Sequence, residues 1–341
     1  MVSRHLCMED TCNRESSCQV SLASLEDLAA LWRDPMAALQ WTCPFVLPPW
    51  LSSWWSVFGR GAQPLIVVVR ERRAIIGIAP LMLQGKTVRF LGDPDVCDYF
   101  DCIVVQGKER LFFTTLLAHL TAQGLGELDL GLLRPDASIR MFLPDIESNG
   151  AVQWCTEQED VFSELDLPAT WDELLGKLDG KQRHELRRKL RRLHDAGSVE
   201  FRRVDNMTQL PAAVDTFLSL FTMNREDKAE FMTDAMASFF QALCLSLGKE
   251  GLLRLFFLDL DGRPVASVFC FDYQGTRYLY NNGYDAAYQE LGVGLMSKVL
   301  SLKAAIDDGL GSYNFLKGGE VYKYRLGGKA IPLWRCHATL F

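Results

Sequence analysis

Two glycines near residue 290 stand where a predicted strand gives way to a predicted helix. The segment Gln289 to Gly294 follows an apolar strand at 276–284 and leads into an apolar helical stretch at 292–308. Amide N–H groups at a helix start have no acceptor within the helix, and the helix dipole favours negative charge there. The spacing therefore predicts a pyrophosphate-binding turn, because a side chain at either glycine would hinder that approach. Its candidate residues are Gln289, Leu291, Gly292, Val293 and Gly294, with Asn281 on the preceding strand.

The same turn has a second, purely structural interpretation. The pattern Gln-x-x-Gly-x-Gly is weak by itself, since glycine makes up about 7% of an average protein. Two glycines at this point would also let the start of the helix pack tightly against the sheet. Both interpretations stay open at the level of the residues.

A concentrated basic segment is the second feature with chemical meaning. Residues 181–203 hold nine Lys and Arg against three acidic residues, a net charge of +6 in a chain whose net charge is −7. Arg183, Arg187 and Arg191 recur every four residues beside an apolar seam of leucines, as on one side of an amphipathic helix. This row is either a solvated face or a platform for an anionic ligand, and Arg183 and Arg187 are its candidate binding residues.

Composition bounds the class of protein. The chain has 341 residues, 48% of them apolar and 23% charged, which predicts a globular protein of two domains or one large domain. No apolar run reaches about 18 residues and residues 1–20 lack the apolar core of a signal peptide, so we expect a cytoplasmic protein without a membrane span. The acidic net charge argues against a general nucleic-acid binder. Ten cysteines without a C-x-x-C pair or zinc spacing predict free thiols and no metal.

The predicted elements alternate between helices and short strands, which is typical of an α/β protein. Helices are predicted at 24–39, 109–122, 210–223, 233–247 and 292–308, besides the basic helix and a short one near 320–325. Strands are predicted at 64–70, 75–83, 87–91, 101–105, 128–132, 161–167, 199–204, 252–260, 264–273, 276–284, 312–316 and 334–340. The two halves share one order of elements. We therefore expect a disordered tail at 1–19, one domain at 20–158 and a second at 159–341, joined in the acidic stretch 145–160.

Several stretches resemble the branch of the GNAT N-acyltransferases that contains the FemABX and CelD/BcsL-type proteins. Gln289 to Gly294 is similar to the acyl-CoA pyrophosphate loop of that superfamily. The other similar segments are Pro44-Phe45 with Trp50, Trp54 and Trp55, Gly77 to Leu81, Phe90 to Gly92, Asp98 to Asp101, Gln182 to Leu193, Asp261 to Ala266, and Phe315 to Gly318 with Tyr322 to Arg325. The resemblance implies two GNAT-like units in tandem, with mixed central sheets flanked by helices and the acyl-CoA loop in the second unit.

The resemblance also implies a catalytic residue that donates a proton to the departing thiolate. GNAT enzymes usually place a tyrosine on the helix after the fifth strand, and Tyr322 matches that position, with Tyr324 as second choice. Glu320 and Asp285 are candidate bases, and Lys323 is a candidate anion-binding residue. The segment Asp98 to Asp101 either belongs to an acceptor cleft or is structural.

The function expected from this resemblance is N-acyl transfer from acetyl-CoA or a longer acyl-CoA to an amine. The acceptor would be a small molecule or glycan precursor of exopolysaccharide, cellulose or envelope synthesis, bound between the halves. Two alternatives remain open: a FemABX-like transfer from aminoacyl-tRNA to a peptidoglycan precursor, and a non-catalytic accessory module of polysaccharide synthesis. The basic helix favours the first alternative, whereas intact glycines in the donor loop argue against the second.

Overall fold

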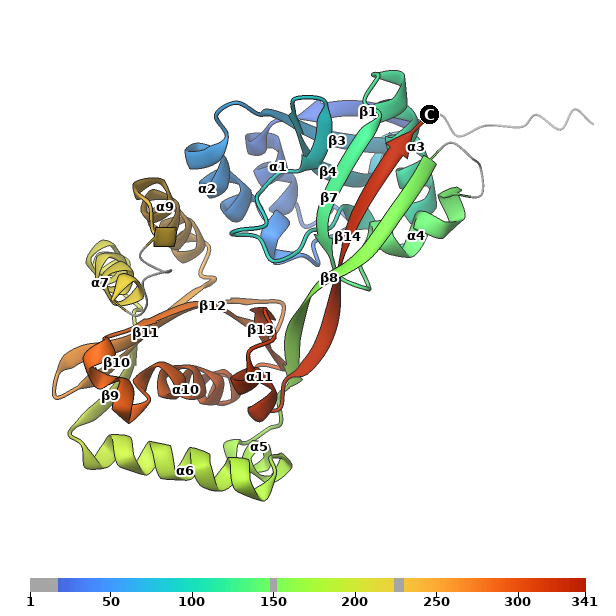
Figure 1. Cartoon of the computed structure of the whole chain (residues 1–341). Helices are drawn as coiled ribbons and strands as arrows, with labels where there is room; N and C mark the ends of the chain where they lie inside the picture. Colours follow the sequence, from blue (N-terminus) through green and yellow to red (C-terminus); the bar gives the residue numbers. More distant parts are fainter. Residues whose placement is uncertain (1–17, 148–151, 224–229) are drawn as a thin grey trace, which may run out of the picture.

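One mixed sheet runs through the whole molecule in the computed structural model, which describes residues 18–147, 152–223 and 230–341. The strand order is β1-β3-β4-β5-β7-β14-β8-β13-β12-β11-β10-β9; in addition, β6 pairs with β4, and β2 pairs with β6. The strands of the first half lie at the upper right of Figure 1, and those of the second half lie at the lower left. Helices flank both parts, so the mixed α/β class expected from the sequence is confirmed.

The first half contains seven strands and four α-helices among the described residues. Its strands are β1 (Cys18–Ala23), β2 (Leu39–Gln40), β3 (Gln63–Glu71), β4 (Ala74–Gln84), β5 (Thr87–Phe90), β6 (Ile103–Val105) and β7 (Glu127–Leu133). Its helices are α1 (Leu25–Trp32), the 3-10 turn η1 (Pro44–Val46), α2 (Pro48–Phe58), α3 (Glu109–Ala122) and α4 (Ser138–Glu147). Pro48 and Pro49 occupy the first turn of α2, where a missing N–H costs nothing.

The second half repeats the plan and adds a basic helix. Its strands are β8 (Val152–Asp166), β9 (Val199–Arg203), β10 (Leu253–Leu260), β11 (Arg263–Tyr273), β12 (Thr276–Tyr284), β13 (Ser312–Lys317) and β14 (Lys329–Leu340). Its helices are α5 (Trp171–Lys177), α6 (Gly180–Asp195), α7 (Leu210–Thr222), α9 (Asp234–Lys249), η2 (Ala286–Leu291), α10 (Val293–Asp307) and α11 (Val321–Arg325). Helix α7 packs on β11 and β12, whereas α10 packs on the other side of the same strands, with α6 beyond it (Figure 1).

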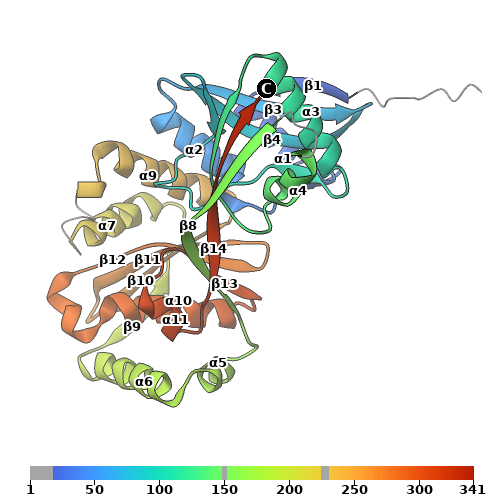
Figure 2. The same ribbon diagram turned by 45° about the vertical axis from the view of Figure 1, so that its right-hand side comes forward.

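Two long strands join the halves. β14 pairs antiparallel with β7 of the first half and along its whole length with β8, while the C-terminal part of β8 also pairs with β13. Figure 2 shows β8 and β14 crossing from one half to the other side by side. The domain boundary that we expected between 158 and 159 falls inside β8, and the division into domains stays a proposal. Of the predicted tail, residues 1–17 lie outside the described residues, and Cys18 and Gln19 belong to β1.

A shared aromatic core fixes the halves against each other. Trp50 of α2 lies edge-on to Tyr280 of β12 at 4.9 Å between ring centroids, and to Phe271 of β11 at 5.4 Å. Trp50 is 1% exposed, and such buried ring pairs are worth about 1 kcal/mol each beyond their burial. The second half is therefore anchored to the first half close to the strand that leads into the glycine turn.

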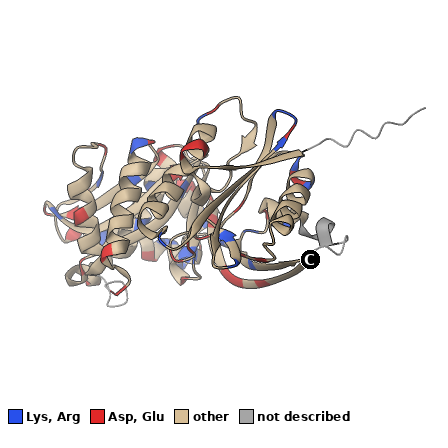
Figure 3. Ribbon diagram, turned by 90° about the horizontal axis from the view of Figure 1, so that it is seen from above, with Lys and Arg blue, Asp and Glu red and all other residues tan. Residues whose placement is uncertain are grey.

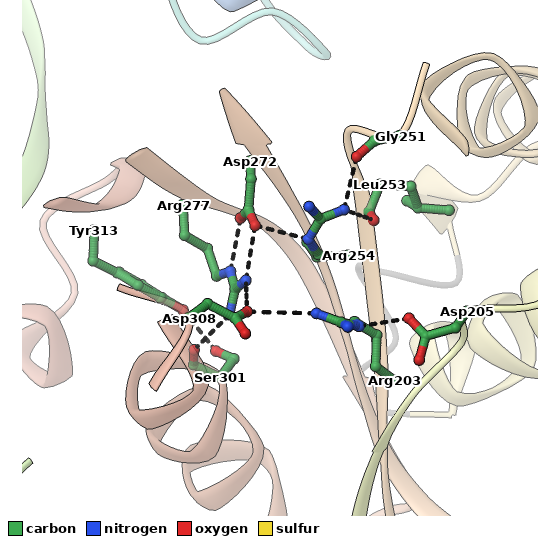
Figure 4. A network of polar contacts seen from close by, with 10 residues as sticks. All are labelled: Arg203, Asp205, Gly251, Leu253, Arg254, Asp272, Arg277, Ser301, Asp308 and Tyr313. Atoms are coloured by element: carbon green, nitrogen blue, oxygen red, sulfur yellow. Dashed lines mark hydrogen bonds and ion pairs between the residues drawn. The ribbon is translucent and has the colours of Figure 1, made fainter. Parts of the chain in front are cut away.

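A buried arginine fixes the opposite end of α10. The Arg277 guanidinium is fully buried, forms a bidentate pair with Asp272 at 2.7 and 2.8 Å, and reaches Asp308 at 2.8 Å and the Ser301 carbonyl at 3.3 Å (Figure 4). A cation at the C-terminal end of a helix also interacts favourably with the helix dipole. This network fixes the C-terminal end of α10 against β11 and β12. Because the helix is a rigid element, its N-terminal end is positioned as well.

No helix among the described residues is long and apolar enough to cross a membrane. The eight described cysteines carry free thiols, and Cys7 and Cys12 lie outside the described residues.

Candidate functional site

The glycine turn forms the junction between η2 and α10. Gly292 has a left-handed backbone (φ +69°) and its carbonyl accepts hydrogen bonds from Leu295 and Met296 at 3.0 and 2.9 Å. The amides of Val293 and Gly294 are the first two of α10, so the helix itself offers them no acceptor. A Cβ at Gly294 would come within 2.4 Å of the Tyr284 ring. Gly294 thus has a packing reason, and the pyrophosphate-binding interpretation of the turn stays a prediction.

The other predicted donor-binding residues surround this junction. Gln289 is exposed on η2, Leu291 is half-buried at its end, and Asn281 is half-buried on β12 opposite Phe269 of β11. A bulge in β12 follows Leu279, because Phe269 faces Asn281 while Cys270 faces Leu279. The structure therefore keeps the loop residues together, with Asn281 farther back along the strand.

Strands β12 and β13 part in front of this turn. They run parallel for three residue pairs, from Thr276 and Ser312 to Tyr278 and Asn314, and then pair no further. Beyond that point a loop of the first half meets both strands. The Tyr280 hydroxyl donates to the Val96 carbonyl at 3.0 Å, and the Lys317 amide donates to the Asp98 carboxylate at 2.6 Å.

Tyr322 lines a narrow slot between three helices. The slot has a volume of about 100 Å³ and is bounded by α6, by Leu295 of α10 and by α11. The Lys298 ammonium lies 4.1 Å from the centroid of the Tyr322 ring, and burial raises the pKa of the Tyr322 hydroxyl. A phenol that stays protonated at neutral pH suits a proton donor, and Leu295, in the first turn of α10, lines the same slot.

Glu320 and Lys323 pair with each other next to Tyr322. The Glu320 carboxylate lies 2.8 Å from the Lys323 ammonium. Burial by itself would raise the pKa of Glu320, but the hydrogen bond and charge of Lys323 bring that pKa below its ordinary value. A carboxylate whose pKa is lowered is a weaker proton acceptor.

The Lys323 ammonium is enclosed by backbone. Lys323 is 1% exposed and its Nζ donates to the carbonyls of Leu316, Lys317 and Gly318 at 3.0, 2.6 and 3.0 Å. Leu316 and Gly318 both have positive φ, +60° and +107°. Since the contacts of this lysine are all internal, it holds the turn that leads from β13 to α11.

Asp285 lies on the other face of the sheet from Tyr322. It caps η2 by accepting from the Ala287 amide at 3.0 Å, and it pairs with Arg263 at 3.1 Å. It lines a depression against α7, whereas the Tyr322 slot lies against α6. Glu320 and Tyr322 therefore lie close together, whereas Asp285 is not brought into the same cluster.

The basic helix α6 packs its leucines inward and leaves its cations outside. Arg183 is half-buried and donates to the Leu175 carbonyl at 3.3 Å, while Arg187 is exposed and has no partner among the described residues. Two other cations of α6 lie towards α10 and η2: Lys189 lines the slot, and Arg192 lies 4.0 Å from Glu290 of η2. On the side away from α6, seen from above in Figure 3, positive and negative segments are interspersed.

Asp98 is a site candidate whose importance depends on the fold. Burial raises the pKa of its carboxyl, which the Lys317 amide opposes by its hydrogen bond. The sequence left its segment, Asp98 to Asp101, open between an acceptor cleft and a structural role. The signal that would have singled it out is the contact with β13, 219 residues away in the chain.

A wide cavity lies on the other side of the loop that precedes Asp98. It measures about 470 Å³ and is lined by residues of α2, β4, β5, β7, α9 and β14 and by the loop from Gly92 to Val96. Strands β5 and β7 run parallel for three residue pairs and part at this cavity, as β12 and β13 do in the second half. The cavity mixes aromatic rings with charges: Trp54, Phe58, Phe90, Arg60, Arg89, Arg335, Asp93, Asp95 and Asp129. No group of His, Cys, Asp and Glu within the described ranges is arranged to hold a metal ion.

Comparisons with known proteins agree with this geometry. Residues 180–324 match the model of the acetyltransferase (GNAT) domain, from the first residue of α6 into α11. The chain matches no curated protein. Its structure is similar to the crystal structure of FemX, at 12% identity over 95% of this chain and 97% of that one, with a TM-score of 0.60. It is also similar to a tandem GNAT protein from the clavulanic acid biosynthesis pathway, at 12% identity over 95% and 98% of the two chains, with a TM-score of 0.51. Residues 180–324 therefore match a GNAT acetyltransferase domain, and the fold of the whole chain is similar to those of FemX and of a tandem GNAT protein.

Proposed function

We propose that this protein transfers the acyl group of an acyl-CoA, acetyl-CoA in the simplest case, to an amine. One observation carries the proposal. The two free amides at the start of α10, those of Val293 and Gly294, lie on the same helix turn as Leu295, which walls the slot of Tyr322. Those amides suit the pyrophosphate of CoA, because a helix start offers both donors and a favourable dipole. The match of residues 180–324 to the GNAT domain supports the same donor.

The chemistry requires one nucleophile and two proton movements. The lone pair of the acceptor nitrogen attacks the thioester carbon, the C–N bond forms, and collapse of the tetrahedral intermediate breaks the C–S bond. The nitrogen gives up a proton and the departing thiolate takes one. In this proposal Tyr322 donates to the thiolate, since burial keeps its hydroxyl protonated.

Three carboxylates are candidates for the base that takes the proton from the acceptor nitrogen. Glu320 is held by Lys323 and its pKa is lowered, and Asp285 lies on the other face of the sheet. Asp98 lies at the junction of the halves, and burial raises the pKa of its carboxyl, which makes it a stronger proton acceptor than an ordinary carboxylate. We therefore propose Asp98 ahead of Glu320 and Asp285.

The acceptor is proposed to enter from the cavity of about 470 Å³ in the first half. That cavity shares the loop at 92–98 with the end of β13, so a ligand there would lie across one loop from the donor strands. Aromatic rings beside carboxylates and arginines fit a polar ring that carries an amine, such as an amino sugar of exopolysaccharide or envelope synthesis. The proposed compartment is the cytoplasm.

A FemX-like aminoacyl transfer from charged tRNA is the second candidate. It is favoured by the likeness to FemX and by the exposed cations of α6. The same fold without catalysis, as an accessory of polysaccharide synthesis, remains the third. The three differ in whether CoA binds and whether a product forms.

Calorimetric titration of CoA and acetyl-CoA into the protein tests the donor. We expect micromolar binding, about −8 kcal/mol. Gln289→Glu, which adds a negative charge to the exposed donor loop, should weaken that binding at least about fivefold. The matched control is Gln209→Glu, the same change at the exposed start of α7. If neither ligand binds the wild type, the acyl-CoA proposal fails and tRNA binding becomes the leading candidate.

A further inference from the structure

The outer side of helix α6 is a basic face that the rest of the described chain leaves uncovered. On its inner side α6 contacts α10 and η2, and there its leucines Leu186 and Leu193 are buried. Figures 1 and 2 both show α6 as the outermost element at the lower edge of the molecule. The side of the helix that points away from α10 therefore faces solvent.

The cations of α6 are concentrated on this outer side. The helix holds seven Lys and Arg against two acidic residues. Lys181, Arg188 and Arg191 are exposed and form a stripe, each at least about 140° around the helix from the buried Leu186, given about 100° per residue. The exposed Arg187 lies beside the stripe. From Lys181 to Arg191 the stripe is about 15 Å long, since a helix rises about 1.5 Å per residue.

Most of the charge on this face is not neutralised within the described part of the protein. Lys181, Arg187 and Arg191 have no hydrogen-bond or ion-pair partner among the described residues. Glu185 is engaged elsewhere, because it pairs with Arg188 at 2.9 Å and with Lys189 at 3.7 Å. Arg187 and Arg191 are four residues apart, a spacing at which like charges destabilise a helix. An external anionic surface would relieve that repulsion.

The form and composition of the face favour a membrane over a nucleic acid as that surface. The face is the convex side of one helix, and α6 contains no Phe, Tyr or Trp on which a base could stack. The whole chain has a net charge of −7 despite this helix, so an anionic polymer that continued past α6 would meet an acidic protein. A flat anionic surface can contact α6 alone, and screening limits the repulsion from more distant acids.

We propose that the outer face of α6, formed by Lys181, Arg187, Arg188 and Arg191, binds the surface of a membrane that contains anionic lipids. Clusters of four or more Lys and Arg on an amphipathic helix bind such lipids. The leucines of α6 face the interior of the protein, so the contact is electrostatic and α6 does not insert into the lipid. The inference goes beyond the proposed function and does not rest on it.

Co-sedimentation of the full chain with lipid vesicles tests this inference. One set of vesicles is made of phosphatidylcholine alone, and the other contains about one third phosphatidylglycerol, which is anionic. The wild type should bind the mixed vesicles at about 0.1 M salt and should not bind phosphatidylcholine alone. At about 1 M salt, where the Debye length falls to about 3 Å, it should be released.

The double variant Lys181→Gln/Arg191→Gln removes two of the cations that have no partner in the described structure. It should bind the mixed vesicles at least about tenfold more weakly than the wild type. The matched control, Arg73→Gln/Lys86→Gln, makes the same two changes at exposed positions in the β3–β4 and β4–β5 turns of the first half, and should bind as the wild type does. Because all four side chains are exposed, thermal unfolding of both variants should match that of the wild type.

Several results would overturn the inference. They are absence of wild-type binding to the mixed vesicles, equal binding to phosphatidylcholine alone, and equal affinities of the double variant and its control. Binding of an unrelated tRNA that the double variant loses, without binding to any vesicle, would also overturn it and assign the face to RNA. The titration of CoA is a separate measurement, so the failure of this inference is distinguishable from the failure of the proposed function.

Discussion

The ammonium of Lys323 donates a hydrogen bond of 3.0 Å to the carbonyl of Leu316, a leucine held at φ +60°. A branched side chain in the left-handed region is strained by about 1 to 2 kcal/mol and persists only where its surroundings hold it. The Asn314 side chain, which accepts from the Leu316 amide at 2.7 Å, holds the same residue from the other side. Strand β13 is thereby bent at the point where β12 leaves it.

Loss of the Lys323 ammonium should destabilise the turn between β13 and α11. Lys323→Met keeps the length of the side chain but leaves three buried carbonyls without their donor, and we expect a loss of about 3 kcal/mol in the free energy of unfolding. Urea denaturation measures it. Lys329→Met serves as control, because Lys329 and its partner Asp166 are largely exposed, and it should change stability by less than about 0.5 kcal/mol. Equal effects of the two variants would contradict the role of the carbonyl contacts.

The tyrosine on α11 should affect turnover rather than binding. If Tyr322 protonates the thiolate, Tyr322→Phe lowers kcat by about 10²-fold or more while the affinity for CoA stays the same. Steady-state kinetics with an amine acceptor, together with calorimetry, separates the two quantities. Tyr324→Phe, two residues on and partly exposed, is the control and should retain full activity. A Tyr322→Phe enzyme with unchanged kcat would remove this residue from the mechanism.

The buried arginine behind α10 should be among the most sensitive positions for stability. Arg277→Met leaves the largely buried Asp272 with one cation fewer and also removes a partner of the partly exposed Asp308, which should cost about 3 to 5 kcal/mol. Thermal unfolding measures the change. Arg254 shares Asp272 but is partly exposed, so Arg254→Met should cost clearly less. The assignment would be wrong if the two variants lost the same stability.

The carboxyl of Asp101 should make stability depend on pH below neutrality. Burial raises its pKa to about 6, against the lowering effect of hydrogen bonds from Ser138 and Cys102. The folded state then binds this proton more tightly than the unfolded chain, so the contribution of Asp101 to stability rises as pH falls through about 6 and is lost as pH rises.

Asp101→Asn isolates this effect. Relative to the variant, the wild type should gain about 1 to 2 kcal/mol between pH 7 and pH 5. Denaturation curves of both proteins at the two pH values give the difference in stability between them at each pH. Groups that titrate alike in both proteins do not contribute to this difference. A difference that stays constant over this range would show that Asp101 does not titrate there.

Local elements were predicted well from the sequence, because their signals lie within a few residues. The expected helix 109–122 is α3 and the expected strand 276–284 is β12, with the same bounds. The Asp261-Gly262 turn joins β10 to β11 with positive φ at both residues, as a two-residue hairpin requires. Each of these follows from periodicity or turn chemistry alone.

Pairing between segments that are far apart in the chain could not be predicted from the sequence. The polar stretch 145–160 indicated a joint, but residues 152–160 are part of β8, whose side chains there are mostly exposed and whose stability comes from pairing with β14. The carbonyl cage of Lys323 was equally hidden, since it depends on the left-handed turn of Leu316. A lysine between two tyrosines carries no sign of burial.

The pairing of β14 with β7 has a consequence for the order in which this protein is made. Glu127 of β7 pairs with Thr339, which is more than two hundred residues later in the chain. This edge of β7 therefore stays unpaired until β14 has been synthesised. During synthesis the first half therefore leaves the ribosome with an open strand edge, a surface that pairs readily with other chains. Chaperone binding to the nascent chain should then persist until β14 emerges, and a premature stop before β14 should produce insoluble protein rather than a free first half.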